Sequence, residues 1–363
     1  METTKVAVIG AGDISDIYLE NLSGVYRAIE IAGIYSRTAA RAKAQADKYG
    51  VPRVYNSMDE LLEDPATSIV LNLTPPQQHF ELSMRCLEAG KHVYTEKAMA
   101  ATLEEGRILV ETAAAKGLTI CGAPDTFLYG GMQTMRKLLD DGYIGRVTGA
   151  TAVILHAGHE TWHANPAFFY KPGGGPMMDL GVYYLTMLVS LLGGVDTVAG
   201  MCDTAFPERV ITSEPRFGER IKVETPTHVT GLMRFQSGVL GSVSASFDAF
   251  KIPSRIEIHG TRGMLEFSDG NVRFYSPDTA AYSNVPLIFP YQKRGQGLGL
   301  ADQVAAIKRG RPPRAGGGLM LHILEVMTAF ERSHSLNTFV KIESVIERPA
   351  PMLYPILPGI VSD

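Results

Sequence analysis

The chain has 363 residues, 45% of them apolar and 20% charged, and a formal net charge of −4. This length suits two domains better than one. The near balance of charge argues against a nucleic-acid or anionic-membrane partner, because either would favour a basic excess. The wide spacing of Cys86, Cys121 and Cys202 excludes a disulfide framework and a C-x-x-C pair. Without a basic leader or an apolar run of membrane-spanning length, a cytoplasmic protein with reduced thiols is expected.

The first stretch of the chain has the pattern of a strand, a glycine turn and a helix. Residues 6–9 form the short apolar run typical of a strand buried on both faces. Gly10 and Gly12 permit a sharp turn, and the free amides of the following helix attract phosphate. This matches the dinucleotide fingerprint, with Ser15 at its third small position. The residues expected to bind the dinucleotide here are Gly10, Gly12, Asp13 and Ile14.

The end of the second strand bears on the choice of cofactor. This strand is expected over residues 29–35 and is followed by Ser36 and Arg37. An acidic residue usually stands here to hold the adenosine ribose of NAD, and it would repel a 2′-phosphate. A hydroxyl and a guanidinium, with Arg41 one helical turn further on, can bind that phosphate instead. NADP is therefore expected and NAD remains possible; a solvated surface arginine is the alternative interpretation.

The third strand, over residues 69–73, runs into Pro75 and Pro76. Because two prolines cannot continue a sheet, this loop is expected at the carboxyl edge of the sheet, where open α/β proteins bind ligands. Thr74, Pro75 and His79 are candidates to contact the nicotinamide ribose. The alternative is that they only punctuate a strand-to-helix connection.

A further strand over residues 92–94 is followed by Glu96 and Lys97, both expected near the cofactor. A lysine at the carboxyl end of a strand, beside a bound nicotinamide, can hydrogen-bond a substrate hydroxyl. It can also stabilise negative charge as the hydroxyl proton leaves. A surface lysine is the alternative.

Three motifs, in order, resemble the glucose-fructose oxidoreductase, inositol dehydrogenase and rhizopine-catabolism (Gfo/Idh/MocA) family: GAGDIS, NLTPPQQH and TEKAMA. The family motif is Glu-Lys-Pro, and this chain has Ala98 at the proline position, a change that bears on the local loop geometry but keeps Lys97. The resemblance implies an α/β protein with a Rossmann dinucleotide-binding domain. We expect that domain over residues 1–125 and an α+β domain for substrate binding and oligomerisation over residues 126–363.

The second domain is expected to contain a large antiparallel or mixed sheet with helices on one side. Residues 227–235 and 239–247 alternate between apolar and small or polar residues around a Gln-Ser-Gly turn, which predicts a hairpin. Shorter strands are expected over residues 255–260, 264–267 and 272–275. In the family the open sheet face packs against a second subunit, so a homodimer or homotetramer is expected.

Residues 177–192 are typical of a largely apolar, buried helix in which Asp179 is the one charge. A buried carboxylate needs a partner, and Tyr183, four positions on, shares its helix face. The family pattern on this helix is Asp-x-x-x-His, and some members have tyrosine at the last position. The resemblance therefore implies a catalytic set of Lys97, Asp179 and Tyr183. A core role for Tyr183 and Tyr184, with Asp179 near a helix cap, is the alternative.

Oxidation of a secondary alcohol needs a base for the hydroxyl proton while a hydride passes to nicotinamide. Tyrosine is a weak base at its ordinary pKa of about 10, and a nearby ammonium favours the phenolate. We expect Tyr183 to be the acid/base, Lys97 to tune it, and Asp179 to hold Lys97 or a substrate hydroxyl. The expected substrate is a sugar, cyclic polyol or sugar derivative, since no arginine clamp for phosphate or carboxylate is evident. The substrate-binding candidates are Lys97, Trp162, His163, Asn165, Tyr170, Asp179 and Tyr183.

Three alternatives to simple dehydrogenation follow from the sequence. His159 to His163 satisfy H-E-x-x-H, the zinc metallopeptidase pattern. Gly158 and the Asn165-Pro166 pair leave room for barely two helical turns, so no metal is expected. A relative that retains nicotinamide and reduces it transiently could isomerise sugars or cleave glycosides. A non-catalytic dinucleotide-binding sensor is the last alternative.

Overall fold

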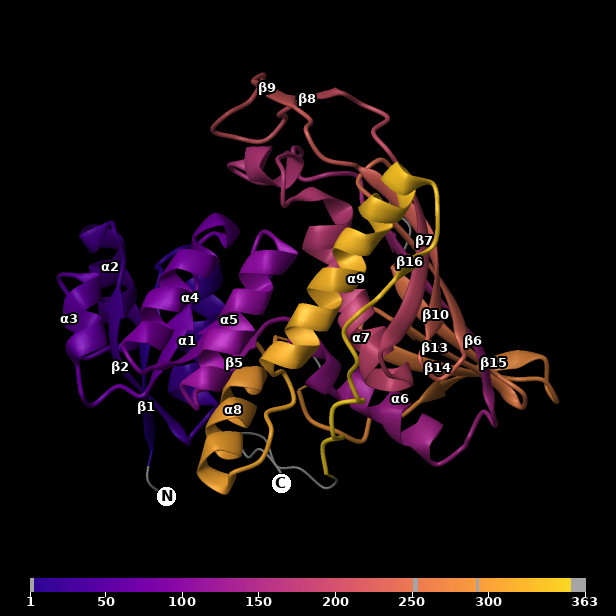
Figure 1. The fold of residues 1–363 in the computed structure, drawn as a ribbon, viewed down its shortest axis with the longest axis horizontal. Coiled ribbons are helices and arrows are strands. Elements are labelled where there is room, and N and C mark those ends of the chain that lie inside the picture. Colours follow the sequence, from indigo (N-terminus) through magenta and orange to yellow (C-terminus); the bar gives the residue numbers. More distant parts are fainter. Residues whose placement is uncertain (1–2, 251–253, 292–293, 354–363) are drawn as a thin grey trace. The chain divides into compact units, whose positions relative to one another are not determined.

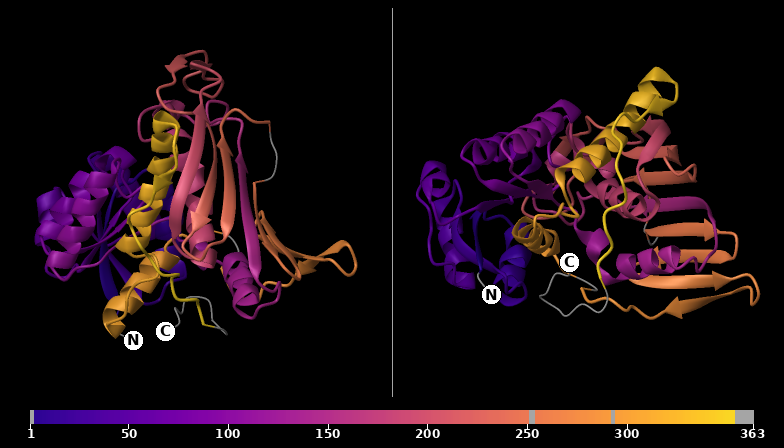
Figure 2. Two further views of the ribbon diagram at one scale, coloured as in Figure 1. Left: turned by 45° about the vertical axis from the view of Figure 1, so that its right-hand side comes forward. Right: turned by 60° about the horizontal axis from the view of Figure 1, so that its bottom comes forward.

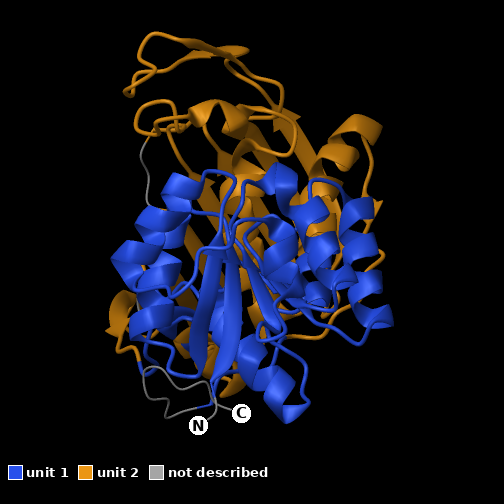
Figure 3. Ribbon diagram, turned by 90° about the vertical axis from the view of Figure 1, so that its left-hand side faces the viewer, with its two compact units in different colours: residues 1–133, 288–321, 349–363 blue, residues 134–287, 322–348 orange. Residues whose placement is uncertain are grey.

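The computed structural model (Figure 1) describes residues 3–250, 254–291 and 294–353. The chain divides into two compact units, coloured separately in Figure 3. Unit 1 comprises Met1–Gln133, Ile288–Leu321 and Pro349–Asp363, and unit 2 comprises Thr134–Leu287 and His322–Arg348. The expected single boundary near residue 125 therefore differs from this division, because two later segments return to unit 1. No helix in the described ranges has the length and apolar character needed to cross a membrane.

Unit 1 is a Rossmann fold. Its described strands form a parallel five-stranded sheet in the order β2-β1-β3-β4-β5. The strands are β1 (Thr4–Ile9), β2 (Ile29–Tyr35), β3 (Ile69–Asn72), β4 (His92–Thr95) and β5 (Ile120–Gly122). The helices are α1 (Ile14–Gly24), α2 (Ala39–Tyr49), α3 (Met58–Glu63), η1 (Pro76–Gln78), α4 (His79–Glu88), α5 (Leu103–Ala115), η2 (Thr126–Leu128) and α8 (Leu298–Arg309). All four residues of β3 are buried, as expected for a strand covered on both faces.

Helix α8 comes late in the chain but belongs to unit 1, because it contacts the Rossmann sheet. Gln303 Nε2 donates to the carbonyl of Val93 in β4 at 3.0 Å. Asp125 accepts from the backbone amides of Gly297 and Gly299 at the start of α8, each at 3.0 Å. A carboxylate at a helix N-terminus stabilises that helix. These contacts join α8 to the Rossmann unit, although the bonded residues are more than 170 positions apart in the chain.

Unit 2 is organised around a mixed sheet of nine strands within the described residues, in the order β15-β14-β13-β12-β6-β11-β10-β7-β16. β11 runs parallel to β6, and the other neighbours are antiparallel. The strands are β6 (Val147–Leu155), β7 (Val195–Asp203), β10 (His228–Phe235), β11 (Leu240–Ser246), β12 (Arg255–Gly260), β13 (Gly263–Ser268), β14 (Asn271–Ser276), β15 (Ala281–Val285) and β16 (Val340–Lys341). The remaining helices are α6 (Gly130–Asp140), η3 (Pro166–Tyr170), η4 (Met177–Gly181), α7 (Val182–Leu192) and α9 (Gly317–Leu336). The expected mixed sheet is thus present.

Helices cover one face of this sheet (Figure 2). The ring of Phe330 in α9 packs so closely on β10 that a Cβ atom at Gly231 would lie 2.5 Å from its Cε1. The opposite face carries exposed apolar side chains, among them Met201, Leu232 and Leu240, which are 74%, 58% and 63% exposed. The prediction of helices on one side of the sheet is therefore confirmed.

Residues 204–226, between β7 and β10, leave the sheet and carry the short antiparallel strands β8 (Glu208–Val210) and β9 (Arg220–Lys222). We call this segment the arm. Ile211 and Ile221 of the arm pack with Tyr170 and Phe247 in a buried cluster. The arm is therefore packed against η3 and the end of β11. Sequence periodicity did not indicate the arm because its strands are so short.

Candidate active site

The glycine turn after β1 has the geometry of a dinucleotide-binding turn. Gly10 has φ +104°, and a Cβ atom there would lie 2.8 Å from backbone atoms of Leu73, so only glycine fits. At Gly12 a Cβ atom would meet nothing within 4 Å, which leaves its backbone open to a ligand. Ser15 is fully buried, and its Oγ donates to the Gly12 carbonyl at 2.6 Å. Asp13 and Ile14, at the start of α1, are exposed. These residues fit a pyrophosphate at the helix N-terminus.

The ends of β2 and β3 meet through Arg37 and Gln78. The Gln78 amide oxygen, turned towards the guanidinium, accepts from both terminal nitrogens of Arg37 at 3.0 and 3.1 Å. Arg37 is exposed, and the Oγ of Ser36 accepts from the Thr38 amide at 3.3 Å. A cation and a hydroxyl therefore stand at the carboxyl edge of the sheet, the place where an adenosine ribose lies in this fold.

His79 ties two loops of that edge together. It is fully buried, and its Nδ1 and Nε2 lie 2.6 and 2.7 Å from the carbonyl oxygens of Ala98 and Thr74. Burial lowers the pKa of the imidazole, against the opposing effect of the two carbonyls. Since backbone engages both nitrogens, any influence of His79 on a dinucleotide passes through these loops. Pro75, which follows Thr74 in one of these loops, is exposed.

Glu96 anchors the backbone at Lys97. Its carboxylate accepts from the hydroxyl of Tyr18 at 2.8 Å and from the backbone amide of Lys97 at 3.0 Å. Glu96 is buried, whereas Lys97 is partly exposed. The Lys97–Ala98 peptide bond is cis. The lysine at the end of β4 thus starts from a backbone position that α1 holds in place.

In unit 2, the predicted helix over residues 177–192 is present, but it begins with the π-helical turn η4 before α7. Such turns recur at functional sites. Most residues of this stretch are buried. The partly exposed residues among 177–192 are Asp179, Leu180, Tyr183 and Tyr184. Asp179 and Tyr183 are therefore both placed where an otherwise buried helix reaches the surface of unit 2.

The partner of Asp179 is His159, the first histidine of the H-E-x-x-H pattern. His159 Nε2 lies 2.8 Å from Asp179 Oδ2, and the two side chains are 5% and 11% exposed. The His159 ring is stacked on Phe169, with 3.9 Å between ring centroids. The expected need of this carboxylate for a partner is thus met by a histidine 20 residues upstream.

The H-E-x-x-H residues face different partners. Glu160 accepts from Arg209 of the arm at 2.6 Å, while His159 faces Asp179. The Nδ1 of His163 accepts from the Asn165 backbone amide at 2.9 Å. Across the described ranges, no group of three or more His, Cys, Asp or Glu side chains is arranged to hold a metal ion.

The structure places Tyr170, one of the expected substrate-binding residues, in the interior of unit 2. Its ring is fully buried, and its hydroxyl donates to Glu160 and accepts from the His159 amide at 3.1 Å. With its ring packed and its hydroxyl engaged, Tyr170 supports the loop, and a direct contact with substrate stays a prediction. Trp162 is 58% exposed and Asn165 is exposed, so these two remain accessible.

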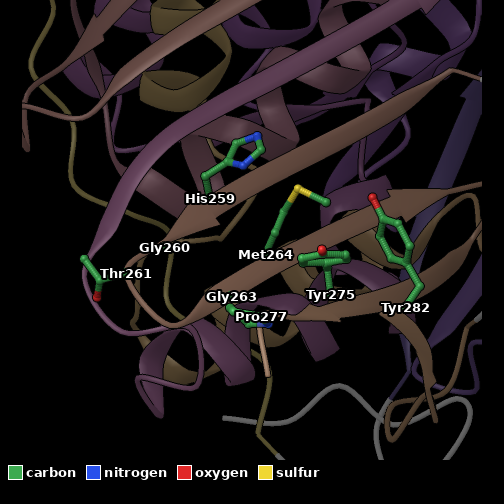
Figure 4. A pocket seen from close by; sticks show the side chains of 8 residues that line it. All are labelled: His259, Gly260, Thr261, Gly263, Met264, Tyr275, Pro277 and Tyr282. Carbon is green, nitrogen blue, oxygen red and sulfur yellow. The ribbon is translucent and has the colours of Figure 1, made fainter. Parts of the chain in front are cut away.

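A separate open pocket of about 350 Å³ lies on the uncovered face of the unit 2 sheet (Figure 4). His259, Met264, Tyr275 and Tyr282 form one row across β12, β13, β14 and β15 in its lining. This row continues through Gly149 of β6 to the exposed Leu240 of β11. The pocket belongs to that open face, whereas α7, with Tyr183, covers the other.

Comparison with known proteins now identifies the family. The sequence model of a family described as an oxidoreductase family with an NAD-binding Rossmann fold matches residues 4–122. The sequence model of the Gfo/Idh/MocA C-terminal domain matches residues 132–266. The chain belongs to the Gfo/Idh/MocA family. It is an NAD(P)-dependent oxidoreductase, and the family, the fold class and the enzyme class expected from its sequence are confirmed.

Curated relatives and solved structures are similar to this chain over most of its length. The trans-1,2-dihydrobenzene-1,2-diol dehydrogenase of Bos taurus is 28% identical over 263 residues, 72% of this chain and 73% of that one. The myo-inositol 2-dehydrogenase of Thermotoga maritima is 26% identical over 350 residues, 94% of this chain and 99% of that one. A levoglucosan dehydrogenase solved with NADH and levoglucosan is 20% identical, with a TM-score of 0.83 over 95% of this chain and 100% of that one. At that identity the last comparison shows the fold alone.

Proposed function

We propose that this oxidoreductase transfers a hydride between nicotinamide and a secondary or anomeric hydroxyl or carbonyl of a sugar, cyclic polyol or sugar derivative. The main support for the proposal is the position of Asp179. It lies on the π-helical turn that leads into the helix of Tyr183, and its carboxylate is hydrogen-bonded to His159. The names of the bovine and Thermotoga relatives, a diol and an inositol dehydrogenase, support the substrate class.

Each member of the proposed catalytic set has one task. Tyr183 takes the hydroxyl proton in oxidation and returns it in reduction. The Lys97 ammonium stabilises the charge that develops on the oxygen, favours the phenolate of Tyr183 and orients the substrate. Asp179 holds Lys97 or a substrate hydroxyl. The nicotinamide, when bound, supplies or accepts the hydride.

The cofactor is proposed to be NADP, with NAD as the second choice. Arg37 and Ser36 would bind the ribose phosphate, since no acidic residue stands at the end of β2 to repel it. The residues proposed to bind the cofactor directly or to shape its site are Gly10, Gly12, Asp13, Ile14, Ser36, Arg37, Thr74, Pro75, His79 and Glu96. Trp162, His163 and Asn165 are proposed to contact the substrate, together with the catalytic set.

The direct test is the absorbance of reduced nicotinamide after purified protein is mixed with NADP+ or NAD+ and a panel of polyols and aldoses. We expect reduction with at least one cyclic polyol or aldose, and a lower KM for NADP+ than for NAD+. Tightly bound nicotinamide that is reduced but not released would favour transient-redox chemistry. Dinucleotide affinity with no reduction across the panel would contradict catalysis and favour a sensor.

We also propose that the open face of the unit 2 sheet contacts a second copy of the chain. Leu232 and Leu240 support this, because both are apolar, more than half exposed and on neighbouring strands. Apolar side chains on an uncovered sheet face are otherwise a liability. Light scattering should give a dimer or tetramer, and Leu232→Asp with Leu240→Asp should give a smaller species. A wild-type monomer at micromolar concentration would contradict this proposal.

A further inference from the structure

We propose that His159 is a positioning residue for the reaction proposed above, on which this inference rests. Its imidazole fixes the carboxylate of Asp179, and the arm of residues 204–226 fixes His159. The Nε2–Oδ2 distance of 2.8 Å lies in the range of charge-assisted hydrogen bonds, and both groups are almost fully buried. In such a low dielectric a hydrogen bond to a carboxylate is stronger than it is in water.

The surroundings of the ring indicate which nitrogen carries the proton. His159 Nδ1 is buried, and among the described residues it has no hydrogen-bond partner. A doubly protonated ring would bury an N–H without an acceptor, which is costly. The neutral ring with its proton on Nε2 avoids this cost and donates to Asp179. His159 therefore acts as a hydrogen-bond donor that orients an ionised carboxylate, and Tyr183 remains the acid/base.

The ring has little freedom to turn away from Asp179. It stacks on Phe169 at 3.9 Å between ring centroids, with an interplanar angle of 23°. Phe247 meets it edge-on at 4.8 Å and 82°. The backbone amide of His159 donates to the Tyr170 hydroxyl at 3.1 Å. Packing and backbone together fix the direction in which Nε2 points.

The arm holds the residue next in the chain by its side chain and its backbone. Arg209 Nη1 donates to Glu160 Oε1 at 2.6 Å. The Thr212 amide donates to the Glu160 carbonyl at 2.9 Å. Because Glu160 directly follows His159, a displaced arm displaces the imidazole and then the carboxylate that it orients. The arm is thereby part of the support of the proposed catalytic set.

Substitution at His159 separates positioning from packing. In His159→Gln the amide nitrogen can donate at a reach similar to Nε2, whereas His159→Leu fills the space without a donor. We expect kcat of His159→Leu to fall about 100-fold, the scale of a misplaced catalytic group, with the KM for dinucleotide unchanged. His159→Gln should recover most of the loss. Equal kcat values for the two variants, with thermal midpoints like that of the wild type, would overturn the proposal.

The Asp179→Asn background tests the coupling directly. If His159 acts through Asp179, adding His159→Leu to Asp179→Asn should lower kcat no further. A further loss equal to that of the single change would overturn the proposal.

A readout without turnover keeps this inference separate from the proposed function. In protein labelled with ¹⁵N-histidine, the His159 ring signals should show the Nε2–H tautomer and should shift in Asp179→Asn. If no sugar or polyol is turned over by the wild type, the proposed function fails, and these spectra still decide the pair. A His159 signal that Asp179→Asn leaves unmoved would overturn it.

Discussion

Arg209 Nη1 lies 2.6 Å from Glu160 Oε1, and the two side chains are 7% and 11% exposed. A second nitrogen of the same guanidinium bonds Asp248, which is also buried. One cation thus pairs with two buried carboxylates, one from the loop before η3 and one that follows β11. The glutamate of an apparent zinc motif is, in this structure, an anchor for the arm.

Arg209→Met should therefore lower the free energy of unfolding by about 3–5 kcal/mol, because it leaves two buried carboxylates without their cation. Urea unfolding measures the change. The matched control is Arg216→Met, also in the arm, whose pairing with Glu219 is partly exposed and should contribute at most about 1 kcal/mol. Equal effects of the two substitutions would show that the buried cluster is not what holds the arm.

His322 should make the fold sensitive to acid. Its Nε2 accepts from the Val195 amide at 2.9 Å, and burial lowers the pKa of the ring from 6.5 to about 4. Because the folded pKa lies below the unfolded one, this stability is present above pH 6.5 and is lost as the pH falls towards 4. Between pH 7 and pH 5 the loss amounts to about 2 kcal/mol.

Urea unfolding of the wild type and of His322→Gln at both pH values isolates this contribution. The variant should lose about 2 kcal/mol less than the wild type on acidification. His334→Gln, at an exposed position of the same helix α9, should behave like the wild type. Wild type and His322→Gln that weaken equally would contradict the assignment.

Arg37 should determine the proposed preference for NADP. Loss of its charge-assisted hydrogen bonds, at about 1.5–3 kcal/mol, should raise the KM for NADP+ roughly 10- to 100-fold in Arg37→Ala. The KM for NAD+ should change little. Arg27→Ala is the control, because Arg27 is exposed just before β2, at the opposite end of the strand. Equal losses with both dinucleotides would argue against a phosphate contact at Arg37.

Gly10→Ala tests the dinucleotide turn. At φ +104° an alanine is strained, and its Cβ would lie 2.8 Å from the Leu73 backbone, so the turn must open. We expect a destabilisation of about 1–3 kcal/mol and loss of dinucleotide affinity in calorimetry. Gly24→Ala is the control, because a Cβ atom there meets nothing within 4 Å. Unchanged affinity in Gly10→Ala would remove this turn from the cofactor site.

Sequence predicts the Rossmann unit well because its signals are local. The apolar strand before Gly10, the small buried Ser15 and the prolines after β3 lie within a few residues of the structure they specify. The alternation of β10 and β11 likewise predicts their pairing, since one face of the hairpin is buried. Family membership follows from the order of such local motifs.

The contacts that the sequence does not predict join residues whose spacing matches neither a helical nor a strand periodicity. His159 and Asp179 meet across a loop and a π-helical turn, so helical spacing points only to Tyr183. Gln303 reaches Val93 over 210 residues, and this contact returns α8 to unit 1. A buried carboxylate without a partner is too costly, so Asp179 requires a hydrogen-bond donor nearby. A search of the sequence for that donor could have pointed to His159.

In the proposed mechanism, Tyr183 moves the proton while Lys97 stabilises the developing charge. Single-turnover reduction of NADP+ by the best polyol or aldose of the panel, in the wild type, Tyr183→Phe and Lys97→Met, tests it most directly. We predict that each variant lowers the rate at least about 100-fold, the scale of lost acid/base catalysis, while binding of dinucleotide is retained. A Tyr183→Phe enzyme that keeps most of the wild-type rate would contradict the account.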